Sequence, residues 1–152
     1  MKHVKLILFV LALFCQRIEV LAQDVNGVRA GTVMTKAQVV ECFGEPDEYL
    51  VEDYSDLDGV YEYYVYGRSQ LLFVYQCFYA FSVSDDRWPL LLDMLDGGVR
   101  PGDSFNSIAS LNPQPADWLG VNAYCIPCLD DFYIIINTSE GIITNINFTF
   151  RN

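Results

Sequence analysis

Histidine is almost missing from this chain: His3 is the only one among 152 residues. It lies in an N-terminal segment that we expect to be cleaved off, which leaves the rest of the chain without an imidazole. That excludes Ser-His-Asp and Cys-His catalysis and histidine metal ligands. The sequence also lacks a Gly-x-Gly-x-x-Gly dinucleotide loop and a Walker phosphate loop. We therefore predict a protein that is not an enzyme and that has no catalytic residues, cofactor site or metal site.

Basic side chains are scarce too, with 9 Lys and Arg against 20 Asp and Glu and a formal net charge of −11. Binding to phosphate groups needs the opposite balance, so nucleic acid is excluded as a partner. A basic protein or a cation fits this charge, although acidity also simply keeps a secreted protein soluble. A glycosidase needs only two suitably spaced carboxylates, so composition leaves that enzyme class as an alternative.

Long apolar runs are missing outside the N-terminus. Residues 1–22 combine a basic start at Lys2 and Lys5, an apolar run that ends at Phe14 and a closing Val-Leu-Ala, the pattern of a secretory signal peptide. The apolar run is about half of the ~20 residues that a membrane span requires. We predict that residues 1–22 are removed and that the mature protein is secreted or periplasmic, with no membrane span.

Four cysteines follow the signal peptide: Cys42, Cys77, Cys125 and Cys128. Exported thiols usually pair, and four cysteines permit three connectivities that the sequence does not rank firmly. We favour Cys42 with Cys77 and Cys125 with Cys128. The Cys-Ile-Pro-Cys motif at 125–128 would be redox-active at the start of a helix in a thioredoxin-like unit, but here it lies among expected strands. Zinc bound by all four is a weaker alternative, because only one close pair exists.

A short motif occurs twice, as Gly-Val-Arg-Ala-Gly at 27–31 and Gly-Val-Arg-Pro-Gly at 98–102. After the first, Thr35 begins a capping box and predicts a helix to about residue 43, which Gly44 ends with a left-handed conformation. After the second, Asp103 or Ser104 can cap a short helix in which Phe105, Ile108 and Leu111 recur at three-residue spacing on one face, and Asn-Pro at 112–113 stops it. The sequence thus predicts a duplicated unit.

Segments rich in Tyr, Phe, Val and Ile follow each expected helix and predict strands. These are residues 48–53, 60–66, 71–75 and 78–84, and then 122–126, 132–137 and 142–150, with a hairpin turn at 139–141. We predict an α+β fold of two tandem repeats, each a short helical segment followed by antiparallel strands, with the helices on one face of the sheet. Repeat one spans residues 23–97, including a packed connector at 85–97, and repeat two spans residues 98–152.

The helical part of the first copy carries a family resemblance. Gly-Thr-Val-Met-Thr-Lys-Ala-Gln-Val at 31–39, followed by Phe-Gly-Glu-Pro at 43–46, is similar to the signature of the SmpA/OmlA outer-membrane lipoprotein family. A doubled unit of this kind in an exported chain resembles the BLIP-like (β-lactamase-inhibitory-protein-like) tandem-repeat fold. The resemblance implies a non-catalytic scaffold that binds another protein. It does not imply β-lactamase as the target, and the second copy lacks most of the motif.

Tyrosines alternate along the expected strand at 60–66. Tyr61 and Tyr63 point to one face and Tyr64 and Tyr66 to the other, so these four are candidates for an interaction surface. Tyrosines that merely shield a sheet need no partner and explain the pattern equally well. The acidic loop at 53–59 resembles a calcium loop but fails the ligand spacing of an EF-hand, so a solvated turn is favoured over a cation site.

We therefore predict an exported, non-enzymatic protein-binding or inhibitor-like module. Its expected partner is another protein, and a basic protein is one option. One alternative is a thiol-active envelope protein that uses Cys125 and Cys128. Another is a structural component of an outer-envelope assembly.

Overall fold

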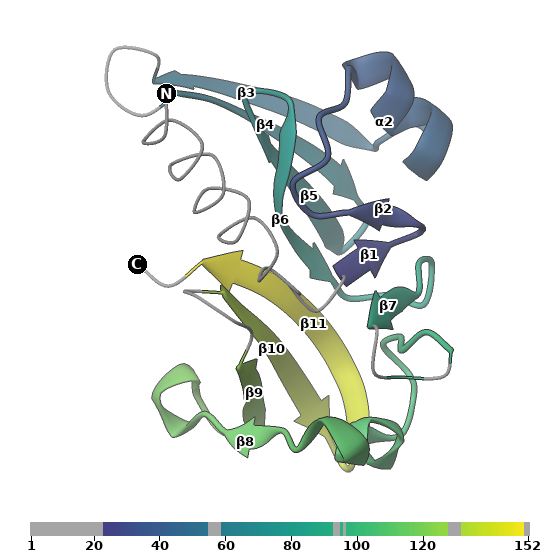
Figure 1. The fold of residues 1–152 in the computed structure, drawn as a ribbon, viewed down its shortest axis with the longest axis vertical. Coiled ribbons are helices and arrows are strands. Elements are labelled where there is room, and N and C mark those ends of the chain that lie inside the picture. The colour runs from purple at the N-terminus through teal and green to yellow at the C-terminus, as the bar shows by residue number, and fades with distance from the viewer. Residues whose placement is uncertain (1–22, 55–58, 93–94, 96, 128–131, 151–152) are drawn as a thin grey trace, which may run out of the picture.

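The computed structural model describes residues 23–54, 59–92, 95, 97–127 and 132–150. The predicted signal peptide, most of the 53–59 loop and Cys128 lie outside these ranges. The main feature is an antiparallel sheet of eight strands in the order β3-β4-β5-β6-β11-β10-β9-β8 (Figure 1). These strands are β3 (Glu48–Tyr54), β4 (Gly59–Tyr66), β5 (Ser69–Val74), β6 (Cys77–Val83), β8 (Gln114–Pro115), β9 (Ala123–Pro127), β10 (Phe132–Ser139) and β11 (Ile142–Phe150).

The remaining elements are short. A second antiparallel sheet has the order β2-β1-β7 and consists of β1 (Gln23–Val25), β2 (Val28–Arg29) and β7 (Leu90–Leu92). The helical elements are the α-helix α2 (Lys36–Phe43) and the 3₁₀ helices η1 (Phe105–Leu111) and η2 (Asp117–Leu119). Within the described ranges, no helix is long and apolar enough to cross a membrane.

The predicted α+β class, with a helix-on-sheet unit repeated twice, is wrong. The structure is mostly β, with 52% strand and 16% helix. The second expected helix is the 3₁₀ segment η1, because its apolar residues Phe105, Ile108 and Leu111 recur every three positions, which is the 3₁₀ period. Ser104 caps it by accepting a hydrogen bond from the Asn106 N–H. The three-residue spacing therefore corresponds to a 3₁₀ helix, not to the second α-helix of the predicted α+β repeat.

The first expected helix is confirmed. The Thr35 N–H donates to Oε1 of Gln38 at 2.8 Å, and the Gln38 N–H donates to Oγ1 of Thr35 at 3.4 Å, which completes the capping box. The helix ends at Phe43, and Gly44 has φ +87° but an extended ψ of 177°, so it breaks the helix without adopting the left-handed helical conformation. Val39 and Phe43 face the core.

The predicted strands match those observed to within two residues at each end. Their residues are rich in Tyr, Phe, Val and Leu, which favour a strand. Burial alternates along β5, where Ser69, Leu71 and Phe73 are buried and the residues between them are half-buried. The predicted hairpin at 139–141 is present, with positive φ at Glu140 (52°) and Gly141 (78°). Two consecutive positive φ values suit the twist of a tight hairpin.

One pair of strands joins the two halves of the large sheet. The first half is the meander β3 to β6, the second half contains β8 to β11, and β6 pairs with β11 through Val83 opposite Ile146 and Phe81 opposite Phe148. We call the face of the sheet that carries these four side chains the core face. Figure 1 shows the long strand β11 running beside β6 at the centre of the molecule.

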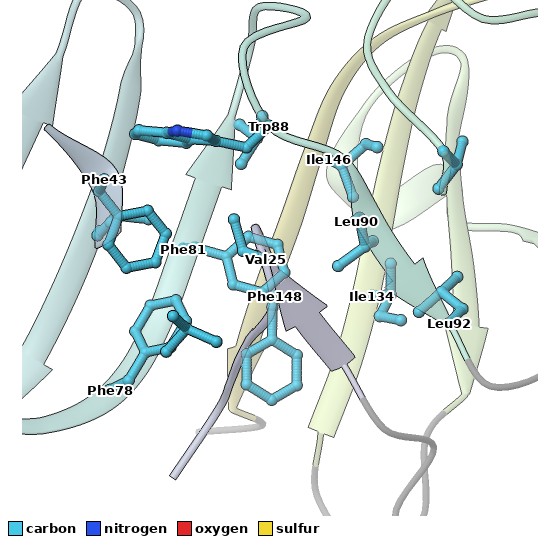
Figure 2. Packing of buried hydrophobic residues seen from close by; sticks show 14 of the residues in the cluster. Val25, Phe43, Phe78, Phe81, Trp88, Leu90, Leu92, Ile134, Ile146 and Phe148 are labelled. Carbon is cyan, nitrogen blue, oxygen red and sulfur yellow. The ribbon is translucent and has the colours of Figure 1, made fainter. Parts of the chain in front are cut away.

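The core face is covered by α2, the small sheet and η1. Phe43 of α2 lies 5.2 Å from the Trp88 ring and 6.1 Å from the Phe78 ring, measured between ring centroids. Figure 2 shows Val25, Leu90 and Leu92 of the small sheet among the aromatic and aliphatic side chains of β6, β10 and β11. Over the second half, Phe105 of η1 packs at 4.2 Å on Tyr124. All of these coverings lie on one side of the large sheet.

The two Gly-Val-Arg openings make the same backbone contacts. The N–H of Gly31 donates to the Phe78 carbonyl on β6, and the N–H of Gly102 donates to the Ile143 carbonyl on β11, both at 2.7 Å. In return, the N–H groups of Phe78 and Ile143 donate to the carbonyls of Thr32 and Asp103 at 2.8 and 2.9 Å. The duplicated sequence therefore corresponds to a duplicated attachment to the middle two strands of the large sheet.

Candidate functional site

The four tyrosines predicted as an interaction surface lie on opposite faces of the large sheet. Tyr64 and Tyr66 are on the core face and are only 1% and 0% exposed. Tyr61 and Tyr63 are half-buried on the other face, which we call the open face. The alternation was visible in the sequence, but only the position of α2 shows which pair lies on the face that α2 does not cover.

Tyr66 and Tyr64 support the fold. The Tyr66 hydroxyl donates to the Gly44 carbonyl at 3.1 Å, just after the end of α2, and the Tyr66 ring packs edge-on at 4.8 Å from Trp88. Burial raises the pKa of Tyr66 to about 12. Burial, followed by the neighbouring Glu62 carboxylate, also raises the pKa of Tyr64. Both phenols therefore stay protonated over the whole physiological range.

Further apolar and aromatic side chains surround Tyr61 and Tyr63 on the open face. On an antiparallel sheet, directly opposed residues share a face, so the register places Leu50, Tyr63 and Leu72 in one row and Tyr61 and Val74 in the next. We define the tyrosine patch as the group formed by Leu50, Tyr54, Tyr61, Tyr63, Leu72, Val74 and Tyr79. Leu50, Tyr54 and Tyr79 remain 45%, 48% and 37% exposed.

Sequence reasoning missed Leu50, Tyr54 and Tyr79. The period of two along β3 would have identified Leu50 and Tyr54, since both share a face with Glu52. Tyr79 gives no such signal, because the register of β5 and β6 shifts between Leu72 and Phe73 and leaves Tyr79 as an extra residue.

The rings of the tyrosine patch contact each other and an acidic side chain. Tyr54 and Tyr61 meet edge-to-face with centroids 6.0 Å apart. The Tyr63 hydroxyl donates to Oε2 of Glu52 at 3.2 Å. Burial is the main cause of the raised pKa values of Tyr63 and Tyr79. The Glu52 carboxylate, which accepts the Tyr63 hydrogen bond, raises the pKa of Tyr63 further. Tyr63 and Tyr79 therefore stay protonated at physiological pH, and the patch places aromatic rings beside a carboxylate.

The described strands that form the tyrosine patch carry acidic residues and no basic ones. Glu48 and Glu52 of β3 lie on the open face, since the register places them opposite Val65 and Tyr61. The sequences of β3, β4, β5 and β6 contain no Lys or Arg. The open face of the first half therefore combines aromatic rings with negative charge.

Polar amides occupy the open face where the two halves meet. Asn145 on β11 donates through Nδ2 to Oγ of Ser84 at 2.6 Å and to Oγ of Ser82 at 3.0 Å. Asn137 and Asn147 both donate to Oδ1 of Asn145. These hydrogen bonds make the open face polar where the two halves meet. The aromatic and apolar surface of the tyrosine patch therefore ends at this boundary.

The structure gives Cys42, Cys77 and Cys125 as free thiols, with Cys42 exposed, Cys77 half-buried and Cys125 buried. It therefore does not contain the expected bridge between Cys42 and Cys77, and the Cys125–Cys128 pairing involves a residue outside the described ranges. Burial raises the pKa of Cys125. A reactive CxxC thiol requires the opposite shift.

The part of the chain that the structure describes contains no cluster of three or more His, Cys, Asp or Glu side chains that could hold a metal ion. Residues 55–58 of the candidate calcium loop lie outside that part. Neither the family models nor the curated proteins nor the solved structures compared with this chain match it.

Proposed function

We propose that this protein is an exported, non-enzymatic module that binds another protein through the tyrosine patch. The observation that carries the proposal is the position of the patch on the face of the large sheet opposite α2, the small sheet and η1. Tyrosine is enriched at protein interfaces, because its rigid ring buries a large area while its hydroxyl keeps a hydrogen-bond partner. Export rests on the signal-peptide pattern of residues 1–22.

The partner that fits this surface carries basic side chains. Glu48 and Glu52 flank the rings, and the strands that form the patch have no positive charge. Arginine or lysine from a partner would stack on the tyrosine faces and pair with the carboxylates in the same contact. The surrounding negative charge would also accelerate association with such a partner at low salt.

The resemblance to SmpA/OmlA domains and to the BLIP-like fold supports a binding role as well. The resemblance to SmpA/OmlA domains rests on residues 31–39 and 43–46, and the resemblance to the BLIP-like fold rests on the doubling of that unit. Neither carries information about the target. The thiol-active alternative is weaker, because burial moves the pKa of Cys125 away from the range of a redox nucleophile.

Photo-crosslinking in the native envelope or secreted fraction would test the proposal. A benzoylphenylalanine crosslinker at Leu50 should capture one predominant protein. The double variant Tyr61→Ser/Tyr63→Ser should lose that product, and Trp118→Ser should keep it. Trp118 is the matched aromatic control, since it is 72% exposed and belongs to η2 beside the opposite edge of the large sheet.

Circular dichroism must show that both variants keep the fold. The same crosslinked product at equal yield from the double variant would contradict the assignment of the surface. A captured partner with an acidic contact region would contradict the charge argument.

A further inference from the structure

Strand β3 forms one edge of the large sheet. It pairs with β4 over seven residues, from Glu48 opposite Val65 to Tyr54 opposite Gly59, and no described strand lies on its other side. At about 3.3 Å per residue, this edge is about 23 Å long. The other edge is the two-residue strand β8. Figure 1 shows β3 as the outermost strand of the first half. Long open edges are sites where another strand can add to a sheet.

The hydrogen bonds of β4 show which backbone groups of β3 point outward. The Val65 carbonyl accepts from the Asp47 N–H at 2.8 Å, whereas the Val60 carbonyl accepts from the Tyr75 N–H at 3.0 Å. Odd-numbered residues of β4 therefore direct their backbone groups to β3, and even-numbered residues direct theirs to β5. Since Tyr49 and Val51 lie opposite even-numbered residues of β4, their N–H and C=O groups point away from the sheet.

The side chains of β3 are exposed except for the half-buried Tyr49, and three of the seven are acidic. Leu50 and Val51 are 45% and 51% exposed. The strand carries Glu48, Glu52 and Asp53 and no basic residue. On the open face, the order along the edge is Glu48, Leu50, Glu52, which places two carboxylates four residues apart with an apolar side chain between them.

We propose that β3 binds an extended basic segment of a partner protein, which adds to the large sheet as a ninth, antiparallel strand. The segment would place two Lys or Arg residues, four apart, opposite Glu48 and Glu52 and an apolar residue opposite Leu50. This inference builds on the proposed protein-binding function and adds the place and the chemistry of the contact. Cross-strand pairs of opposite charge stabilise such an arrangement.

A second copy of this chain fits the edge poorly. Two β3 strands side by side would bring six carboxylates together without a basic residue to balance them, and like charges across a strand pair are destabilising. The same charges that prevent self-association select a basic strand.

The probe for the test is a fluorescent peptide, Thr-Thr-Lys-Thr-Val-Thr-Lys-Thr-Thr, with a glutamate-for-lysine peptide as its control. We expect the lysine peptide to bind, its affinity to fall as salt is added, and the amides of Tyr49 and Val51 to become protected from hydrogen exchange. N-methylation of the two threonines beside the valine should abolish binding, because their N–H groups would donate to β3. N-methylation of the valine, whose N–H would point outward, should preserve it.

Three protein variants separate the backbone contacts from the charges. Val51→Pro removes an outward N–H without removing a bond to β4, as proline is tolerated on a sheet edge, and should weaken binding about tenfold. Glu48→Gln/Glu52→Gln should weaken it about fivefold, and Glu48→Lys/Glu52→Lys should bind the glutamate peptide instead. Thermal unfolding must confirm that each variant folds.

The inference would be overturned if the lysine peptide bound equally well to the wild type and to Val51→Pro. It would also be overturned if the lysine and glutamate peptides bound equally well to the wild type, or if the protein formed a concentration-dependent dimer through β3. Crosslinking at Leu50 that is lost in Tyr61→Ser/Tyr63→Ser but kept in Val51→Pro would leave the proposed function standing and reject the edge. Loss of binding in Val51→Pro with retention in the tyrosine double variant would support the edge and reject the patch.

Discussion

Phe81 and Phe148 stack across the boundary between the two halves of the large sheet, with ring centroids 5.5 Å apart and planes 23° from parallel. They are directly opposed on β6 and β11, the one pair of neighbouring strands that links β3–β6 to β8–β11 in the described sheet. Both side chains are buried, at 4% and 3% exposure. This contact makes a single core out of two segments that are far apart in the sequence.

Phe148→Ala should therefore lower the free energy of unfolding by about 3–5 kcal/mol, the usual cost of truncating a buried phenylalanine. Leu72→Ala, on the half-buried open face, is the control and should cost less. Denaturant unfolding followed by circular dichroism measures both. Equal losses for the two variants would contradict the central role of the boundary.

Thr35→Ala should destabilise the protein by about 1 kcal/mol, because it removes the acceptor for the Gln38 N–H at the start of α2. Thr35→Ser retains the hydroxyl and should stay within a few tenths of the wild-type value. Thermal and denaturant unfolding of the pair test this. An alanine variant as stable as the serine variant would show that the cap has no energetic role.

Alkaline pH should destabilise the protein through Tyr66. The pKa of this phenol is about 12 in the folded protein and near 10 in an unfolded chain, so its contribution is fully present below pH 10. As pH rises from 10 to 12, the unfolded state loses the proton first and the free energy of unfolding falls, by up to about 1.4 kcal/mol per pH unit.

Tyr66→Phe removes this ionisation, so its stability should fall less steeply between pH 10 and pH 12. At neutral pH the variant should be about 1 kcal/mol less stable, because the hydrogen bond to the Gly44 carbonyl is lost. Tyr75→Phe, at a side chain that is 60% exposed, is the control. Identical pH slopes for the wild type and Tyr66→Phe would contradict the assignment.

The thiols should differ in reactivity toward a disulfide reagent at pH 8. Cys42 is exposed and should react first, whereas Cys125 is buried, has a raised pKa and should react only after denaturant is added. Single-cysteine variants assign the phases. A mass deficit of about two hydrogens, together with an unreactive Cys42, would instead show that the expected Cys42–Cys77 bridge forms on export.

Local features of this protein could be predicted from neighbouring residues alone. The capping box at Thr35, the positive φ values at Glu140 and Gly141 and the strand alternation along β4 each depend on interactions within a few residues. The small sheet could not be predicted in this way. Its strand β7 (Leu90–Leu92) follows Pro89 and pairs with β1, more than 60 residues earlier in the chain.

The sequence by itself determined where α2 and the seven longer strands of the large sheet lie and that tyrosines occupy both faces of β4, because backbone conformation and side-chain period are local properties. The tertiary structure decided the rest. Packing of α2 and the small sheet on one side buries Tyr64 and Tyr66 and leaves Tyr61 and Tyr63 half-buried on the open face. The pairing of β6 with β11 merges two segments into one mostly β fold. Both outcomes depend on which apolar surfaces meet across long separations in the chain, and no local pattern encodes that choice.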